Sequence, residues 1–309
     1  MATLKQLSKN PELLSGGHRA CAGCSCAVAL RQIMLAAGKD TVISFATGCM
    51  EVVTTIYPYS AWRVPYIHNA FENSFSTMSG VEASYQSLKR LGRLPVDKKL
   101  NFIAFAGDGG TYDIGFQALS GAAERGHDIL HVCYNNEAYM NTGIQRSSAT
   151  PLGASTTTTP AGKVVPGKKQ HKKDLVGIMA AHNIPYVAQT TPAHWKDLNT
   201  KVEKALSITG PKFMNVYCSC HRGWRIKEDQ SLEILRLAVD CCVAPLFEVE
   251  DGEWKLNYKP KEKKPVSEWL KLQGRFKHLS RPEFQPVAEE LQAQVDKDWE
   301  ALLKKCGEA

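Results

Sequence analysis

The chain has 309 residues, of which 43% are hydrophobic and 22% charged, so we expect an ordinary globular protein with a large core and not a disordered chain. No stretch approaches the roughly 18 apolar residues of a membrane span, and the N-terminus shows no signal-peptide pattern, which predicts a cytoplasmic protein with reduced cysteines and no membrane partner. The net charge of +7 suits an acidic partner, but the lysines have no aromatic residues among them, so we expect no nucleic-acid partner.

Helices and buried strands are predicted to alternate along the chain, which is typical of an α/β protein. The first predicted elements, in chain order, are a helix at 25–37, a strand at 41–46 and a helix at 74–91. One regular βαβ unit follows, with a strand at 101–106, a glycine-rich turn at 107–115, a helix at 116–126 and a strand at 128–136. After a long loop at 145–173 come a helix at 174–182, a strand at 185–189, a helix at 195–207 and a strand at 212–218.

The character of the sequence changes after residue 228. A helix from Leu232 to Val239 is predicted, then a small strand pair near 246–258 and a polar helical tail. We therefore expect a domain at 1–228 and a C-terminal extension at 229–309 that packs on the same domain or on partner subunits. The expected fold class is α/β, with a mainly parallel sheet flanked by helices.

Residues that can bind a metal and a phosphate follow the two strands of the βαβ unit. Gly107, Asp108 and Gly109 end the first strand, and Asn136 ends the second. Parallel strands end at one edge of a sheet, so carboxylate and amide oxygens meet there, and the Ala138 carbonyl can complete a Mg²⁺ site beside a diphosphate. A tight turn with an aspartate cap would explain the Gly-Asp-Gly alone, but the Asn-Asn pair favours the cofactor site.

Gly-Asp-Gly followed by Asn-Asn at this spacing is the thiamine diphosphate motif, and longer stretches make the likeness closer. From about residue 15 to 280 the chain resembles the β subunit of the pyruvate:ferredoxin oxidoreductase (pyruvate synthase) family, in ACAGC, ATGCMEVVTTIYPYSAW, HNAFEN, GDGGTYDIGFQALSGAAERGHD, NNEAYMNTGIQRSSATP and LKLQGRFKHL. The resemblance implies a thiamine-diphosphate-binding fold. The cofactor contacts that it implies are Cys26, Cys49, Gly107, Asp108, Gly109, Gly110, Asn136, Glu137, Ala138, Tyr139 and Asn141.

Three cysteines lie within six positions near the N-terminus. The pair Cys21-x2-Cys24 most often means zinc in a reduced protein, and Cys49 and Cys220 are the natural third and fourth ligands. These spacings fit four thiolates but leave zinc and a [4Fe–4S] cluster both open. A thiamine site favours the cluster, because oxidising a carbanion made from a 2-oxoacid needs an electron acceptor and zinc has no redox chemistry. The resemblance likewise implies a [4Fe–4S] cluster on these four cysteines.

The other cysteines need separate interpretations. Strand alternation is expected to turn Cys218 and Cys220 to one side, and Cys220 is taken as the ligand because it directly precedes the segment with Gly-Trp, as in the family. Cys26 is either a cofactor contact or a packed residue of a helix face. The remaining ones are interpreted as small buried apolar side chains, namely Cys133, Cys241 and Cys242.

Asn141 is the one catalytic residue that the resemblance implies. Its amide is expected near the reactive carbon of the thiazolium ring, where it can donate a hydrogen bond to developing charge. The alternative is an asparagine that only forms the turn before Thr-Gly.

The chain is expected to be one component of a complex. The resemblance implies that the carboxylate that activates thiamine comes from another subunit, and the sequence lacks the C-x2-C-x2-C-x3-C-P run of ferredoxin-type clusters. Partners of α, γ and δ type, ferredoxin and coenzyme A are therefore expected.

The substrate is left more open than the family. His221-Arg222 stands where many members have Pro-Thr, so pyruvate is preferred, with oxalate, an aryl glyoxylate or a branched-chain 2-oxoacid as alternatives. Two other classes of protein would use only some of these motifs. A thiamine enzyme without redox chemistry needs no cluster, and a scaffold subunit held together by zinc needs no thiamine.

Overall fold

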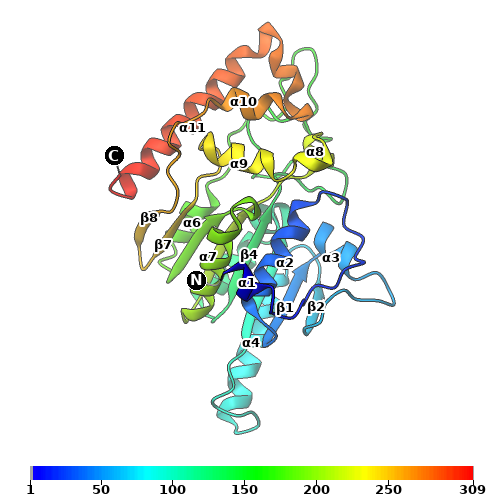
Figure 1. Cartoon of the computed structure of the whole chain (residues 1–309), viewed down its shortest axis with the longest axis vertical. Helices are drawn as coiled ribbons and strands as arrows, with labels where there is room; N and C mark the ends of the chain where they lie inside the picture. The colour runs from blue at the N-terminus through cyan, green and yellow to red at the C-terminus, as the bar shows by residue number, and fades with distance from the viewer. Residues whose placement is uncertain (1–2, 309) are drawn as a thin grey trace.

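The computed structural model describes residues 3–308 (Figure 1). One sheet contains eight strands in the order β2-β1-β3-β4-β6-β5-β7-β8. The first six strands in this order are parallel, and β7 and β8 are antiparallel, which confirms the expected mainly parallel α/β fold. The strands are β1 Thr41–Ala46, β2 Tyr66–Asn69, β3 Asn101–Gly107, β4 Leu130–Asn135, β5 Tyr186–Thr190, β6 Lys212–Tyr217, β7 Phe247–Glu250 and β8 Glu253–Leu256.

Helices cover both faces of the sheet. The helices are α1 Leu4–Leu7, α2 Ser25–Ala37, α3 Cys49–Thr54, α4 Ser74–Arg90, α5 Phe116–Glu124, α6 Leu175–Ala180, α7 Trp195–Ser207, α8 His221–Trp224, α9 Glu233–Asp240, α10 Val266–Lys271 and α11 Gln285–Lys305. Helices α2 and α7 pack together on one face, and α4, α5 and α6 contribute to the core of the other. Helices α9, α10 and α11 gather at one end of the molecule (Figure 1).

Strand β3 shows why the sheet needs both layers. Ile103 and Phe105 point into the core formed with α2 and α7, whereas Phe102 and Ala104 point into the opposite core, which also contains residues of α9 to α11. Side chains alternate along a strand, so a strand covered on both faces is apolar throughout. The continuous apolar runs in the sequence follow from this arrangement.

The long predicted elements are found close to their expected ends. Helices at 25–37 and 195–207 and the strand at 41–46 match α2, α7 and β1, and the strand pair near 246–258 is β7 with β8. Several features differ from expectation: the turn at 107–115 contains a π-helical turn, Gly109–Asp113, and the short elements α1, α3, β2 and α8 were not predicted.

The C-terminal residues continue the main sheet. Strand β7 pairs with β5, and Trp269 and Trp299 are buried in the core shared with α5 and α6. The division at residue 228 stays a prediction.

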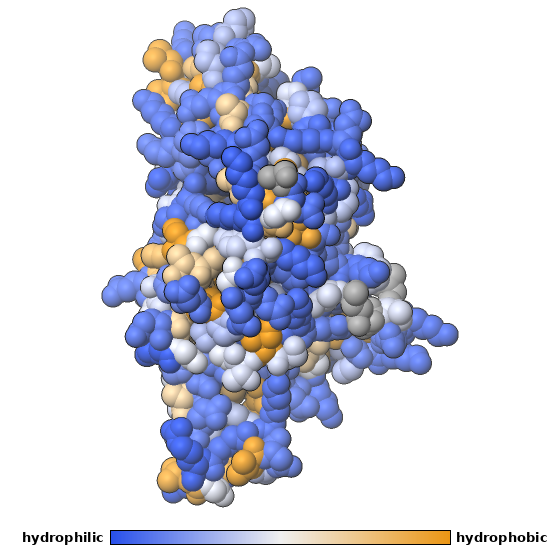
Figure 2. Space-filling view, turned by 90° about the vertical axis from the view of Figure 1, so that its left-hand side faces the viewer, coloured by the Kyte–Doolittle hydropathy of each residue, from blue (hydrophilic) through white to orange (hydrophobic). Residues whose placement is uncertain are grey.

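None of the helices within residues 3–308 has the length and apolarity needed to cross a bilayer. The face of the molecule in Figure 2 is mainly hydrophilic, with scattered hydrophobic areas.

Candidate functional site

The structure brings the ends of β3 and β4 together as the sequence predicts. These strands are parallel neighbours, with Gly107 paired to Tyr134, so Asp108 and Asn136 follow them at one edge of the sheet. The backbone N–H of Asn136 donates to Asp108 Oδ1 over 3.3 Å. Two residues separated by 28 positions in the chain are thus in direct contact.

Three oxygen atoms converge at this edge. The Asn136 side-chain oxygen lies 3.0 Å from the Ala138 carbonyl oxygen and 3.0 Å from Asp108 Oδ1, and both of these atoms are hydrogen-bond acceptors. If the side-chain amide is rotated so that its oxygen and nitrogen exchange places, the amide nitrogen donates a hydrogen bond to each of them. Neighbouring oxygens around an octahedral Mg²⁺ with bonds of about 2.1 Å lie about 3.0 Å apart. The arrangement with three oxygens therefore fits Mg²⁺.

The Asp108 carboxyl group is fully buried. Burial raises its pKa to about 7, although hydrogen bonds from Ser147 Oγ at 2.5 Å and from the Asn136 backbone act in the opposite direction. A buried carboxylate is costly unless a cation or several donors compensate it. A divalent cation at the three oxygens would provide this compensation.

Glycines shape the floor of the hollow. A Cβ atom on Gly109 would lie 2.2 Å from Tyr139 Cε1, and one on Gly110 would lie 3.0 Å from the Phe71 carbonyl oxygen. The hydroxyl of buried Tyr134, which borders the hollow, has no hydrogen-bond partner among residues 3–308. A phosphate group fits such a place, because glycine backbone allows a close approach and the Tyr134 hydroxyl can donate a hydrogen bond.

The hollow itself is small, with a volume of ≈ 20 Å³. Asn141 lies exposed at its edge in a turn closed by Gly143 N–H donating to the Met140 carbonyl at 3.3 Å. Its position therefore agrees with both a catalytic and a turn-forming role.

Glu137 lies between the two residues that offer neutral oxygens, but its carboxylate faces elsewhere. Tyr217 OH donates to Oε1 over 3.0 Å, and Arg275 Nη2 donates to Oε2 over 2.5 Å. Glu137 is not among the residues that line the hollow. The cofactor contact expected for Glu137 stays a prediction.

Three helix N-termini bring the predicted cluster cysteines into one region. Cys24 precedes α2, Cys49 begins α3, and Cys220 precedes α8, where its Sγ accepts from the Gly223 N–H at 3.3 Å. Ser25 links α2 to the segment before α8, because its Oγ accepts a hydrogen bond from the Ser219 N–H at 2.8 Å and donates one to the Ser219 carbonyl at 2.9 Å.

The thiols of this region influence one another. Burial, together with the nearby thiols of Cys220, Cys24 and Cys21, raises the pKa of Cys49 to about 12. A hydrogen bond with Cys26, followed by burial, raises the pKa of Cys24. Within residues 3–308, however, no three or more His, Cys, Asp or Glu side chains form a group suited to one metal ion.

Cys218 and Cys220 do not turn to one side, so the expectation from strand alternation is wrong. Strand β6 ends at Tyr217, and the chain then bends toward α8. Cys218 is fully buried in the core with α2 and α7, whereas Cys220 is half-buried and packs against the other core. Cys218 instead faces Cys26, which also lies 3.7 Å from Asn136 Nδ2.

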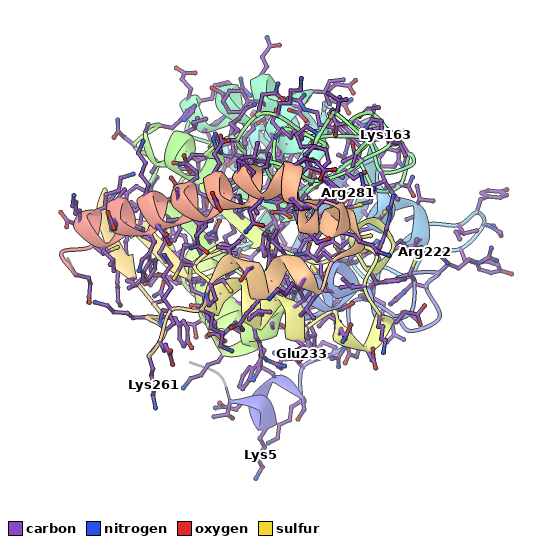
Figure 3. The ribbon with its side chains drawn as sticks, turned by 90° about the horizontal axis from the view of Figure 1, so that it is seen from above. Lys5, Lys163, Arg222, Glu233, Lys261 and Arg281 are labelled. Atoms are coloured by element: carbon purple, nitrogen blue, oxygen red, sulfur yellow. The ribbon has the colours of Figure 1, made fainter. Side chains whose placement is uncertain are left out.

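Cys133, Cys241 and Cys242 are buried, as predicted. His221 is largely buried, with Nε2 3.8 Å from Glu228 Oε1, while its neighbour Arg222 is exposed (Figure 3). The His221 side chain is therefore turned toward an acidic residue of this chain.

A second cavity, of ≈ 290 Å³, lies between the sheet and α11. Three amide side chains, those of Asn135, Gln189 and Asn215, border it together with several aromatic rings. Neither the glycines of the turn nor the four predicted cluster cysteines line it, although Cys242 does. We place the candidate site at the smaller hollow, because Asn136 and Ala138 line it and Asp108 contacts Asn136 directly beside it.

Sequence reasoning missed residues that support the ligands. Ser147 contacts Asp108 from the long loop and stands in the stretch that carries the resemblance, so it could have been noticed. Arg275 contacts Glu137 from 138 positions further along the chain, and no local pattern announces this contact.

Comparisons with known proteins agree with this geometry. Residues 46–216 match the family described as "Thiamine pyrophosphate enzyme, C-terminal TPP binding domain". "Pyruvate synthase subunit PorB" of Thermotoga maritima is 53% identical over 94% of this chain and 91% of that protein, and its namesake in Methanocaldococcus jannaschii is 54% identical over 89% and 93%. "Ketoisovalerate oxidoreductase subunit VorB" of Pyrococcus abyssi is 45% identical over 93% and 91%.

A solved structure also shares the fold. The 2-oxoglutarate:ferredoxin oxidoreductase from Magnetococcus marinus superposes with a TM-score of 0.53 over 74% of this chain and 78% of that one, at 17% identity. The identities of about half over nearly whole chains decide the relationship: the chain carries a thiamine-diphosphate-binding domain and belongs to the β subunits of the 2-oxoacid:ferredoxin oxidoreductase family.

Proposed function

We propose that this chain is the β subunit of a pyruvate synthase. In the presence of coenzyme A, the complex converts pyruvate to acetyl-CoA and CO₂, reduces two equivalents of one-electron ferredoxin and releases one proton; the reaction is reversible. Thiamine diphosphate and Mg²⁺ are held by this chain, which also carries one [4Fe–4S] cluster. Subunits of α, γ and δ type complete the complex.

The Asn136 side-chain oxygen, which lies 3.0 Å from both the Ala138 carbonyl oxygen and Asp108 Oδ1, carries the proposal. These atoms would hold Mg²⁺, and the glycine turn from Gly107 to Gly110 would hold the diphosphate. When bound, thiamine diphosphate stabilises the negative charge that the loss of CO₂ leaves on the substrate carbon. The role of this chain is to bind the cofactor, to fix its position and to aim the Asn141 amide at the reacting atoms.

A cluster is favoured over zinc because the proposed reaction produces electrons, which a cluster can accept and zinc cannot. Cys21, Cys24 and Cys220 lie close enough to Cys49 to raise its pKa. A [4Fe–4S] cluster accepts four such thiolates.

The small volume of the hollow supports a divided active site. At ≈ 20 Å³ it cannot enclose a cofactor of the size of thiamine diphosphate, so other walls must come from a partner. We propose that the partner supplies the carboxylate that activates the aminopyrimidine ring.

Pyruvate is proposed as the substrate because the two relatives with 53% and 54% identity are both named pyruvate synthase subunits. A relative named for ketoisovalerate is 45% identical, so a branched-chain 2-oxoacid is the first alternative. Assays of the complex with pyruvate, 2-oxoisovalerate, oxalate and phenylglyoxylate distinguish these substrates by their kcat/KM values.

The Asp108→Ala variant tests the cofactor site. It removes one oxygen ligand and should abolish retention of thiamine diphosphate in the purified complex, while iron content stays that of the unaltered complex. Asp113→Ala is a matched control in the same turn, because Asp113 is not one of the proposed Mg²⁺ ligands. Stoichiometric cofactor in the Asp108 variant would place the site elsewhere.

Three cysteine variants test the cluster. Compared with the unaltered complex purified under anaerobic conditions, Cys24→Ser and Cys220→Ser should each lose about four irons and four acid-labile sulfides per β chain, together with one signal in the electron paramagnetic resonance spectrum of the reduced complex. Cys218→Ser should lose neither, because Cys218 faces Cys26 in the core. Loss in Cys218→Ser with retention in Cys220→Ser would reverse the ligand assignment, and retention in all three would refute the cluster.

A further inference from the structure

A buried ion pair joins the loop after β4 to the C-terminal part of the chain. Arg275 Nη2 lies 2.5 Å from Glu137 Oε2, and the two side chains are only 3% and 1% exposed. Arg275 belongs to the stretch LKLQGRFKHL, to which the proposed function gives no task. Because water cannot stabilise these charges, each depends on the other for its position.

Glu137 has an unusual backbone conformation at a place that matters. Its φ angle is 67°, in the left-handed region that a side chain disfavours, and it separates the Asn136 and Ala138 oxygens. Such a conformation persists only where the surroundings enforce it. Here every polar group of Glu137 is bound: its N–H donates to Asn135 Oδ1 at 3.1 Å, and its carbonyl accepts from Thr150 Oγ1 at 2.6 Å.

Arg275 acts on Asn136 by a second route. Its guanidinium lies 4.1 Å from the centre of the Trp224 ring, a cation–π contact. Trp224 Nε1 donates to the Asn136 carbonyl at 2.9 Å. One side chain therefore braces two consecutive residues of the loop, Asn136 through Trp224 and Glu137 directly.

Other contacts fix Arg275 itself. Its Nε donates to Gln273 Oε1 at 2.8 Å, and its carbonyl accepts from the Ser155 N–H at 3.0 Å. The segment around Arg275 thus lies against the long loop at 145–173; in Figure 3 the labelled Arg281 and Lys163 show the same two segments side by side, and Arg281 Nη1 donates to the Gly162 carbonyl at 3.5 Å.

We propose that Arg275 is a positioning residue for the cofactor site: through Glu137 and Trp224 it holds the Asn136 and Ala138 oxygens at the spacing that Mg²⁺ requires. The inference rests on the proposed function, because it takes these oxygens as the ligands. A buried ion pair can often be replaced by apolar side chains without loss of stability, so stability alone does not require a charged pair here. Partners behind metal ligands typically change metal affinity about 10- to 100-fold when they are removed.

The test uses the complete complex depleted of cofactor. Equilibrium dialysis with thiamine diphosphate at increasing Mg²⁺ concentration gives the Mg²⁺ needed for half-saturation, and a thermal scan gives the melting temperature. Arg275→Met should raise the required Mg²⁺ by about 10- to 100-fold. Lys201→Met is the matched control, since Lys201 is a 1% exposed cation paired with Asp197 at 2.8 Å in α7, away from the hollow; it should leave the Mg²⁺ requirement unchanged.

Two further variants separate positioning from packing. Arg275→Lys keeps the charge and should raise the required Mg²⁺ above that of the unaltered complex but less than Arg275→Met does. If Arg275→Met is too unstable to purify, Arg275→Lys and Glu137→Gln are each compared with the unaltered complex, and a normal Mg²⁺ requirement in both would overturn the inference. Glu137→Gln combined with Arg275→Met should weaken binding no more than the stronger of the two single changes, because both remove the same brace.

Normal Mg²⁺ dependence in Arg275→Lys and Arg275→Met would overturn the inference, as would an equal loss of affinity in Lys201→Met. Asp108→Ala in the same assay distinguishes failure of the positioning role from failure of the proposed cofactor site. If Asp108→Ala loses cofactor and the Arg275 variants do not, only the positioning role fails; if Asp108→Ala binds normally, the proposed site itself is wrong.

Discussion

Asn141 lies exposed at the edge of the hollow, where its amide is free to meet a bound substrate. Replacing it by alanine should lower turnover by roughly 100-fold or more, because a donor aimed at developing charge acts mainly in the transition state. Cofactor binding should change little, since Asn141 is not one of the proposed ligands. Steady-state turnover of the complex and dialysis with thiamine diphosphate measure the two effects.

Asn141→Asp distinguishes the two interpretations of this residue. Aspartate and asparagine both favour turns, so a residue that only forms the turn would tolerate the change. Aspartate lacks the amide donor, so a catalytic residue would not. Turnover close to normal in Asn141→Asp would return Asn141 to the role of turn former.

The proposed metal ligands could be predicted because they depend on local sequence. Asp108 and Asn136 each directly follow an apolar strand, and parallel neighbours end at one edge of a sheet. Ser147 and Arg275 could not be predicted in the same way, because their contacts with Asp108 and Glu137 span 39 and 138 positions and depend on how loops return to the sheet. Sequence reasoning therefore found candidate ligands but not the residues that hold them.

Among the helices and strands, length separated what could be predicted from what could not. The 13-residue helices α2 and α7 show a clear apolar face, so their periodicity gave their ends. Helix α8 has only four residues, too few to show a period, and its start turns Cys220 away from the side that Cys218 faces. The wrong expectation for this cysteine pair follows from one unrecognised bend after β6.

The contact between α2 and the segment after β6 gives a prediction at this scale. Ser25 is fully buried, and Ser25→Ala leaves the Ser219 N–H and carbonyl without their partner. The free energy of unfolding should fall by about 1–3 kcal/mol, the cost of unsatisfied buried groups. Because Cys24 and Cys220 adjoin these serines, iron should also be lost from the complex faster in air.

Ser84→Ala in α4 is the control, since Ser84 is exposed and bonds only within its own helix. Denaturant unfolding of the isolated chain and the rate of iron loss measure the two effects. Equal stability of the Ser25 and Ser84 variants would show that the serine contact does not hold the two elements together.

Over the whole molecule, the C-terminal residues belong to the same core as the cofactor domain. They cover one face of the sheet, add two strands to it and supply Arg275 to the loop after β4. An extension that could be removed would share few buried side chains with the rest. We therefore expect one folding unit from α2 to α11.

A chain ending at residue 228 tests this. The cut removes Phe247, Trp269, Val295, Trp299 and Leu302, all buried in the shared core. Burying each such side chain contributes about 1.5–3 kcal/mol, so their loss, roughly 8–15 kcal/mol, matches the entire stability of a typical domain, about 5–15 kcal/mol. The shortened chain should show no cooperative thermal transition, whereas a chain ending at Leu303, which keeps these five side chains, should unfold cooperatively like the full chain. A cooperative transition in the chain ending at 228 would instead support an independent domain with a separate extension.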